Sequence, residues 1–141
     1  MTLQNITNFI KNNNHTNIIL MTGASFCRQT YKHGGACIYV SKDIQFISIN
    51  LDQYNKEKDL EICALKLCLL SSSFTIICIY RSPTGNFTYF LNQLESILNK
   101  LYKTSTELIL CDDFNINYFN DNSRKPLLDS LFTSFSPFST V

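Results

Sequence analysis

The sequence predicts an α/β domain in which antiparallel strands are followed by a β-α-β crossover. Short apolar runs rich in branched and aromatic residues occur between residues 18 and 80, and turn-forming residues separate them. A long amphipathic stretch follows, and then another apolar run, "LILC". Because 141 residues is the size of one ordinary domain, we expect one domain at 18–141 after a poorly defined segment at 1–17.

The first part of the chain is expected to be mainly β-structure. Residues 1–17 have only a weak apolar spacing, which fits a short helix and a frayed tail equally well. The runs "GGACIYV" and "IQFISINL" then predict successive antiparallel strands. The patch "DQYNKEKD" leads into "LEICALKLCLL", and "SSS" leads from there into "FTIICIY". Connections this short between strands predict hairpins.

Two helices are expected in the second part of the chain. After "SPTGN", apolar residues recur at spacings of three and four, which predicts an amphipathic helix. These residues are Phe87, Phe90, Leu91, Leu94, Ile97, Leu98 and Leu101. The stretch "SRKPLLDSLFTSF" predicts a second helix that starts near Ser123, with Pro126 tolerated in its first turn.

The order strand, helix, strand from residue 74 to residue 111 has a consequence for the position of polar side chains. A β-α-β crossover makes its two strands parallel and near neighbours in one sheet. Tyr80 ends the first of these strands and Asp113 ends the second, so both are expected at the same edge of the sheet. Ligands of α/β proteins usually bind at such an edge.

Composition narrows the class of protein. A hydrophobic fraction of 45% argues against disorder, and a formal charge of +1 argues against a strongly basic nucleic-acid binder. Most of the six cysteines lie in apolar runs, so Cys37, Cys63, Cys68, Cys78 and Cys111 are expected to be reduced and mostly buried. Without a CxxC pair and with only two histidines, a zinc site is not expected.

Targeting signals are not evident in the sequence. The N-terminal residues lack a basic start followed by a continuous apolar core, so no signal peptide is expected. No apolar run approaches the roughly 18–20 residues that a membrane span needs. We therefore expect an intracellular protein.

The run "CDDFNIN" contains the residues most suited to chemistry. An Asp near a phosphate can orient or deprotonate water and can bind a hard cation such as magnesium. Asn115 points to the same side as Asp113 if the strand continues, and its amide can donate to a phosphoryl oxygen or to water. Tyr80 could add a phenolic donor. Spacing alone favours the ordinary alternative, in which Asp and Asn form a turn and Tyr packs in the sheet.

A family resemblance favours the chemical interpretation. The run "CDDFNINYF" resembles the GDFN motif of the endonuclease/exonuclease/phosphatase family, and the surrounding sequence resembles the apurinic-type endonuclease domain of non-LTR retrotransposons. The blocks "SFCRQTYKHGGACIYV", "IYRSPTGNF" and "SRKPLLDSL" resemble that domain in the same order. The resemblance covers most of the chain from about residue 25 onward, and ordered blocks are more specific than GDFN alone.

The resemblance implies a fold, an activity and roles for individual residues. The implied fold is a four-layer αββα sandwich of two mainly antiparallel or mixed sheets. The implied activity is cleavage of a DNA phosphodiester with Mg²⁺, in the nucleus if the chain is part of a retroelement protein. Asp113 would hold the metal and orient the water nucleophile, Asn115 would position that water and the phosphate, and Tyr80 would contact the phosphate.

The sequence also departs from the family pattern. Asp112 stands where the family has Gly, which could strain the turn or repel substrate, and Ser82 stands where Pro is frequent. The family's Asn and its principal metal ligand, a Glu, precede the "SFCR" block, and "MTLQNITNF" contains no glutamate. The family also has a further Asp and a strand with the sequence Ser-Asp-His, both located after the last matching block. His33 does not match the His of that strand. We therefore expect a partial domain truncated at both ends, either a partial endonuclease or an inactive remnant with a binding or structural role.

Overall fold

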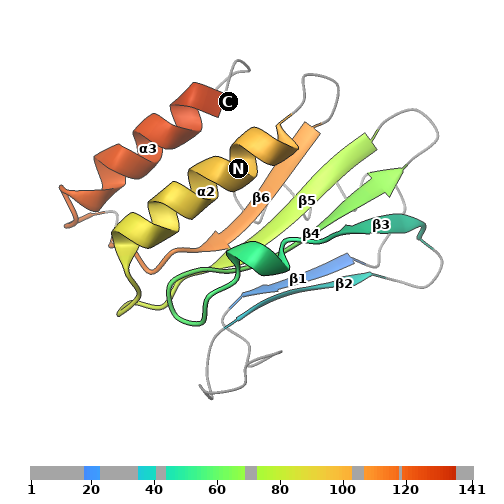
Figure 1. Cartoon of the computed structure of the whole chain (residues 1–141), viewed down its shortest axis with the longest axis horizontal. Coiled ribbons are helices and arrows are strands. Elements are labelled where there is room, and N and C mark those ends of the chain that lie inside the picture. Colours follow the sequence, from blue (N-terminus) through green and yellow to red (C-terminus); the bar gives the residue numbers. More distant parts are fainter. Residues whose placement is uncertain are drawn as a thin grey trace.

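The computed structural model describes residues 18–22, 35–40, 44–68, 73–102, 107–117 and 119–135 (Figure 1). These residues form three layers: two helices, a four-stranded sheet and a two-stranded sheet. The fold is therefore mixed α/β, as predicted. The predicted segment at 1–17 lies outside the described residues, as do Cys27 and His33.

The four-stranded sheet contains the predicted hairpins and the predicted crossover. Its strands follow the order β3 (Phe46–Ile49), β4 (Glu61–Cys68), β5 (Ser73–Tyr80) and β6 (Glu107–Asp113). The pairs β3–β4 and β4–β5 are antiparallel, whereas β5 and β6 are parallel. Every residue of β5 after the first is buried, which explains why its sequence is a continuous apolar run rather than an alternating one.

The two-stranded sheet corrects one prediction. It consists of β1 (Ile18–Thr22) and β2 (Ala36–Val40), which pair antiparallel. The run "GGACIYV" was expected to be the neighbour of "IQFISINL", but β2 and β3 belong to different sheets. Apolar periodicity identifies a strand without identifying its partner. Here Ala36, Ile38 and Val40 pack face to face against the apolar cluster of the larger sheet.

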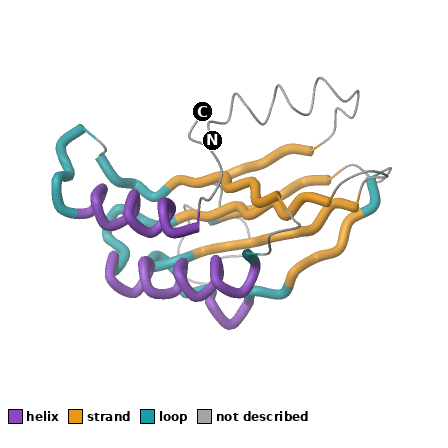
Figure 2. Tube along the Cα trace, turned by 90° about the horizontal axis from the view of Figure 1, so that it is seen from above, coloured by secondary structure: helices purple, strands orange, loops and turns teal. Residues whose placement is uncertain are grey.

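Both predicted helices are present and cover the other face of the larger sheet (Figure 2). Helix α2 spans Phe87–Leu101, and the side chain of Asn86 caps it by accepting a 2.9 Å hydrogen bond from the Tyr89 N–H. Helix α3 spans Arg124–Phe135 with Pro126 in its first turn, as predicted. Neither described helix is long and apolar enough to cross a membrane.

The described residues account for three layers, so the implied four-layer sandwich is not confirmed. Among the described residues, both helices lie on the same side of the larger sheet, and the two-stranded sheet lies on the other side. No described helix covers the outer face of the two-stranded sheet. The described part of the chain is thus an α-β-β arrangement.

Two connections meet at the end of the sheet where β5 finishes. The β3–β4 connection includes a short 3-10 helix, η1 (Asp52–Tyr54), and a turn in which Lys58 adopts a left-handed φ of 72°. The carbonyl oxygen of Lys58 accepts a 2.9 Å hydrogen bond from the N–H of Ser82 in the β5–α2 connection. That carbonyl also lies so close to Gly85 that a Cβ there would sit 2.2 Å from its oxygen. Only glycine fits this approach without a backbone shift.

The cysteines follow the prediction in part. Cys78 and Cys111 are buried neighbours in the β5–β6 register, and Cys37 and Cys63 are half-buried. Cys68 is exposed, because it is the last residue of β4. None of these described cysteines is in a disulfide.

Thiol labelling of the native chain is expected to distinguish these sites. Burial raises the pKa of Cys111 to about 12, so its reactive thiolate is scarce at about pH 8. We expect a maleimide to label Cys68 rapidly and Cys78 and Cys111 only on unfolding, as followed by mass spectrometry of peptides. The Cys68→Ser variant should lose the fast site, and the chain in urea should label throughout. Rapid labelling of native Cys111 would contradict the buried register.

A methyl group at residue 85 is expected to destabilise the fold. Gly85→Ala should lower the free energy of unfolding by about 1–3 kcal/mol, the usual cost of overpacking, because the new Cβ meets a backbone oxygen. Thr88→Ala, in the exposed first turn of α2, serves as the control and should leave stability nearly unchanged. Equal urea midpoints for the two variants would show that the two connections are not packed this closely.

Candidate functional site

Tyr80 and Asp113 are direct neighbours in the parallel pair β5–β6, as the crossover predicted. Side chains alternate along a strand, so both share a face with Cys78 and Cys111, two residues earlier. Those cysteines belong to the apolar cluster that faces the two-stranded sheet. Tyr80 is buried and Asp113 is half-buried. A phenol and a carboxylate therefore lie side by side where the two strands end.

Glu61 continues this row on the other side of Tyr80. It is the first residue of β4, pairs with Tyr80 in the antiparallel register and is only 8% exposed. One of its carboxylate oxygens accepts a 3.2 Å hydrogen bond from the N–H of Lys58. Glu61 was not predicted from the sequence, because its place opposite Tyr80 depends on the exact register of the β4–β5 hairpin. The row Glu61–Tyr80–Asp113 thus combines two acids and one phenol on one face.

Asn115 follows this row outside the strand. A shared direction with Asp113 was predicted only if the strand continued, but β6 ends at Asp113 and Asn115 adopts a left-handed φ of 50°. Asn tolerates this conformation better than most residues do. Strand alternation therefore does not set its direction. Its side-chain N–H instead donates a 2.8 Å hydrogen bond to the carbonyl oxygen of Arg81, directly after Tyr80.

Phe114 anchors the connection that carries Asn115. Its side chain is 3% exposed and lies 5.2 Å from Phe90 of α2 and 6.0 Å from Phe132 of α3, measured between ring centroids. Asn117, the last residue of the "CDDFNIN" run, stabilises a local turn, because its side-chain oxygen accepts a 3.1 Å hydrogen bond from the N–H of Phe119. For Asn117 the structure thus favours the turn-forming alternative.

Asp112 causes no backbone strain at the position where the resembling family has Gly. It lies within β6 opposite Ile79, and it is not among the described residues with positive φ. Alternation directs it to the sheet face opposite to that of Asp113. The side chain is exposed at the surface. Nearby protein atoms still displace part of its hydration and raise the pKa of its carboxyl, and the Asp113 carboxylate raises it further.

Arg81 is a second residue that the sequence analysis missed. Its side chain has no exposed surface, although it carries a charge and directly follows Tyr80. Its backbone N–H donates a 3.0 Å hydrogen bond to the carbonyl oxygen of Asp113, which extends the β5–β6 ladder by one bond. The only sequence signal was a charged residue directly after a strongly apolar strand.

The described residues offer few ligands for a metal. They contain no group of three or more His, Cys, Asp or Glu side chains that could hold an ion together. Glu61 and Asp113 are two strands apart, which places their Cα atoms about 10 Å from each other. A magnesium ion often keeps several waters and takes one or two carboxylates together with substrate phosphates. The half-buried carboxylate of Asp113 fits that mode of binding.

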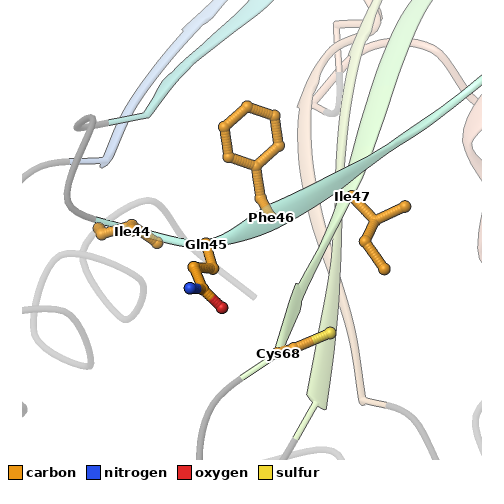
Figure 3. A pocket seen from close by; sticks show the side chains of 5 residues that line it. All are labelled: Ile44, Gln45, Phe46, Ile47 and Cys68. Carbon is orange, nitrogen blue, oxygen red and sulfur yellow. The ribbon is translucent and has the colours of Figure 1, made fainter.

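The described pocket lies away from this row. Ile44, Gln45, Phe46, Ile47 and Cys68 line it around the start of β3 (Figure 3). Strand β3 is at the opposite edge of the sheet from β6. Phe46 also pairs with Leu67, near the end of β4 that is remote from Glu61. This pocket is therefore separate from the candidate site.

Comparison with solved structures shows which fold these elements form. No protein-family model and no curated protein sequence matches this chain. The chain is similar to the endonuclease domain of TRAS1, a telomere-specific non-LTR retrotransposon, with a TM-score of 0.66 and 16% sequence identity. The match covers 91% of this chain and 62% of the TRAS1 domain. At this identity the likeness shows the fold alone, which is similar to that of the TRAS1 domain.

Proposed function

We propose that this chain is part of a metal-dependent DNA endonuclease domain of a non-LTR retrotransposon. The observation that carries the proposal is the pairing of Tyr80 with Asp113 at the strand ends, beside the connection that holds Asn115. The "CDDFN" block and the likeness to the TRAS1 endonuclease domain support the same chemistry. DNA is then the substrate, and the nucleus is the place of action.

Each residue of the proposed site has a role that suits its chemistry. The Asp113 carboxylate orients the attacking water and accepts its proton. The Asn115 amide has two N–H donors, one of which is held by Arg81, so the other and the oxygen can position the water and the phosphate. The Tyr80 hydroxyl donates to a phosphoryl oxygen, where negative charge grows as the bond to phosphorus forms.

Magnesium is the proposed cofactor, with Asp113 as its ligand from this chain. When bound, the ion would supply charge neutralisation at the phosphate. Since one carboxylate with water ligands holds magnesium weakly, we expect activity to need a high magnesium concentration. For the fold we propose the four-layer αββα sandwich, and the two helices and two sheets of the described residues support it.

A second candidate function is that of a catalytically inactive remnant with a binding or structural role. The observation that favours it is the lack of a three-ligand metal group among the described residues. The two candidates differ in one measurable property, because only the endonuclease cuts DNA in a way that depends on Asp113.

Nicking of supercoiled plasmid tests the proposal. The purified chain should nick slowly with magnesium and stop in chelator. Asp113→Asn should lower the rate by about 10²–10⁴-fold, because the variant cannot accept a proton from water. Asp129→Asn, an exposed carboxylate on α3, is the matched control and should nick at the unchanged rate. Absence of nicking, or nicking that Asp113→Asn leaves intact, would refute the endonuclease proposal and favour the inactive remnant.

A further inference from the structure

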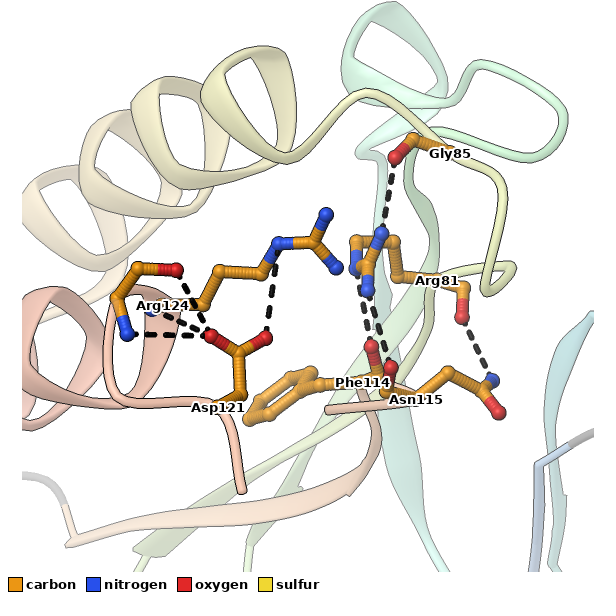
Figure 4. A network of polar contacts seen from close by, with 7 residues as sticks. Arg81, Gly85, Phe114, Asn115, Asp121 and Arg124 are labelled. Carbon is orange, nitrogen blue, oxygen red and sulfur yellow. Dashed lines mark hydrogen bonds and ion pairs between the residues drawn. The ribbon is translucent and has the colours of Figure 1, made fainter. Parts of the chain in front are cut away.

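The guanidinium group of Arg81 joins two connections that are distant in the sequence (Figure 4). Its Nε donates a 2.9 Å hydrogen bond to the carbonyl oxygen of Phe114, and one terminal nitrogen donates at 3.2 Å to that of Asn115. The other terminal nitrogen donates at 2.9 Å to the carbonyl oxygen of Gly85. One planar group thus holds the β6–α3 connection against the β5–α2 connection.

The backbone of Arg81 closes this network. Its carbonyl oxygen accepts a hydrogen bond from the Asn115 side chain, while its N–H donates to Asp113. Arg81 therefore contacts three consecutive residues, Asp113, Phe114 and Asn115, through its backbone and side chain. The contacts to Asn115 hold both its backbone carbonyl and its amide group. Such a double attachment can maintain the left-handed conformation of Asn115, which costs free energy on its own.

The charge of Arg81 has no carboxylate directly beside it in the described part of the chain. Neither described ion pair involves it. Carbonyl oxygens and the rings of Phe87 and Phe90, 5.7 and 5.9 Å from its central carbon, surround the group instead. Burial lowers the pKa of Arg81 and nearby Arg124 lowers it further, yet a guanidinium remains charged in proteins.

We infer that Arg81 is a positioning residue of the proposed phosphodiester site, which fixes Asn115 relative to Asp113 and Tyr80. The inference rests on the proposed function for its catalytic consequence, but not for the hydrogen bonds themselves. A lysine would retain the charge without the planar fork that reaches carbonyl oxygens on two connections at once. Arg81→Lys is therefore the informative variant, because it separates the shape of the group from its charge.

The kinetic test compares Arg81→Lys with Arg124→Lys. Arg124 is a half-buried neighbour that pairs with Asp121 at 3.7 Å and has no proposed role in the site. Arg81→Lys should lower kcat for plasmid nicking about 10–100-fold with little change in KM, the effect of a small displacement of a positioned group. Arg124→Lys should change neither constant. Equal kcat for the Arg81→Lys variant and the wild type would overturn the inference.

A double-mutant cycle separates positioning from a purely structural role. If Arg81 acts through Asn115, Arg81→Lys should slow the Asn115→Ala variant far less than the wild type. A purely structural role would instead give the same fold-change in both backgrounds, together with a matching loss of stability. Additive effects on kcat would therefore overturn the inference.

An NMR measurement keeps the test independent of cleavage. In Arg81→Lys, the side-chain amide signals of Asn115 should shift and exchange faster with solvent, because Asn115 loses the guanidinium bond that helps to hold its amide against the carbonyl oxygen of residue 81. The side chain of Asn92, exposed on α2, is the internal control and should not change. Unchanged Asn115 signals would show that Arg81 does not hold Asn115 and would overturn the inference. If those signals change but the wild-type chain does not nick DNA, the contact between Arg81 and Asn115 stands and the proposed function fails.

Discussion

The parallel pairing of β5 with β6 is the contact on which the arrangement of the site depends. It places Tyr80 beside Asp113 and makes the connections after both strands leave from one end of the sheet. Helix α2 makes this pairing possible, because its apolar face packs on the sheet while the chain crosses from one strand to the next. Strand β5 is buried on both faces, so it can hardly shift without loss of packing.

The connections after these strands are held by polar contacts inside the protein rather than by the apolar core alone. Lys58, Ser82 and Gly85 bring the β3–β4 connection against the β5–α2 connection. Arg81 joins the β5–α2 connection to the start of the β6–α3 connection. The ring of Phe114, the first residue of the β6–α3 connection, packs against aromatic rings of both helices. Loops with this many internal hydrogen bonds are suited to hold a site, because their side chains keep a defined position without bound substrate.

The start of α3 is organised by hydrogen bonds of its own. One carboxylate oxygen of Asp121 accepts hydrogen bonds of 3.2 and 2.9 Å from the N–H groups of Ser123 and Arg124, so it caps the start of α3 (Figure 4). These bonds lower the pKa of Asp121, since they favour the charged carboxylate. Asp121 thus has a structural task, which distinguishes it from Asp113 at the end of β6.

The local elements, and the edge of the sheet at which the site lies, can be predicted from the amino-acid sequence alone. The three and four spacing of apolar residues in α2 and the crossover that pairs Tyr80 with Asp113 both follow from periodicity and chain order. Strand register and loop conformation could not be predicted in this way, because they depend on contacts between residues far apart in the chain. Only the β4–β5 register brings Glu61 opposite Tyr80, and only the folded connections bury Arg81 and turn Asn115 out of the strand pattern. A strand's partner is likewise chosen by packing of whole faces, which is why β2 pairs with β1 instead of β3.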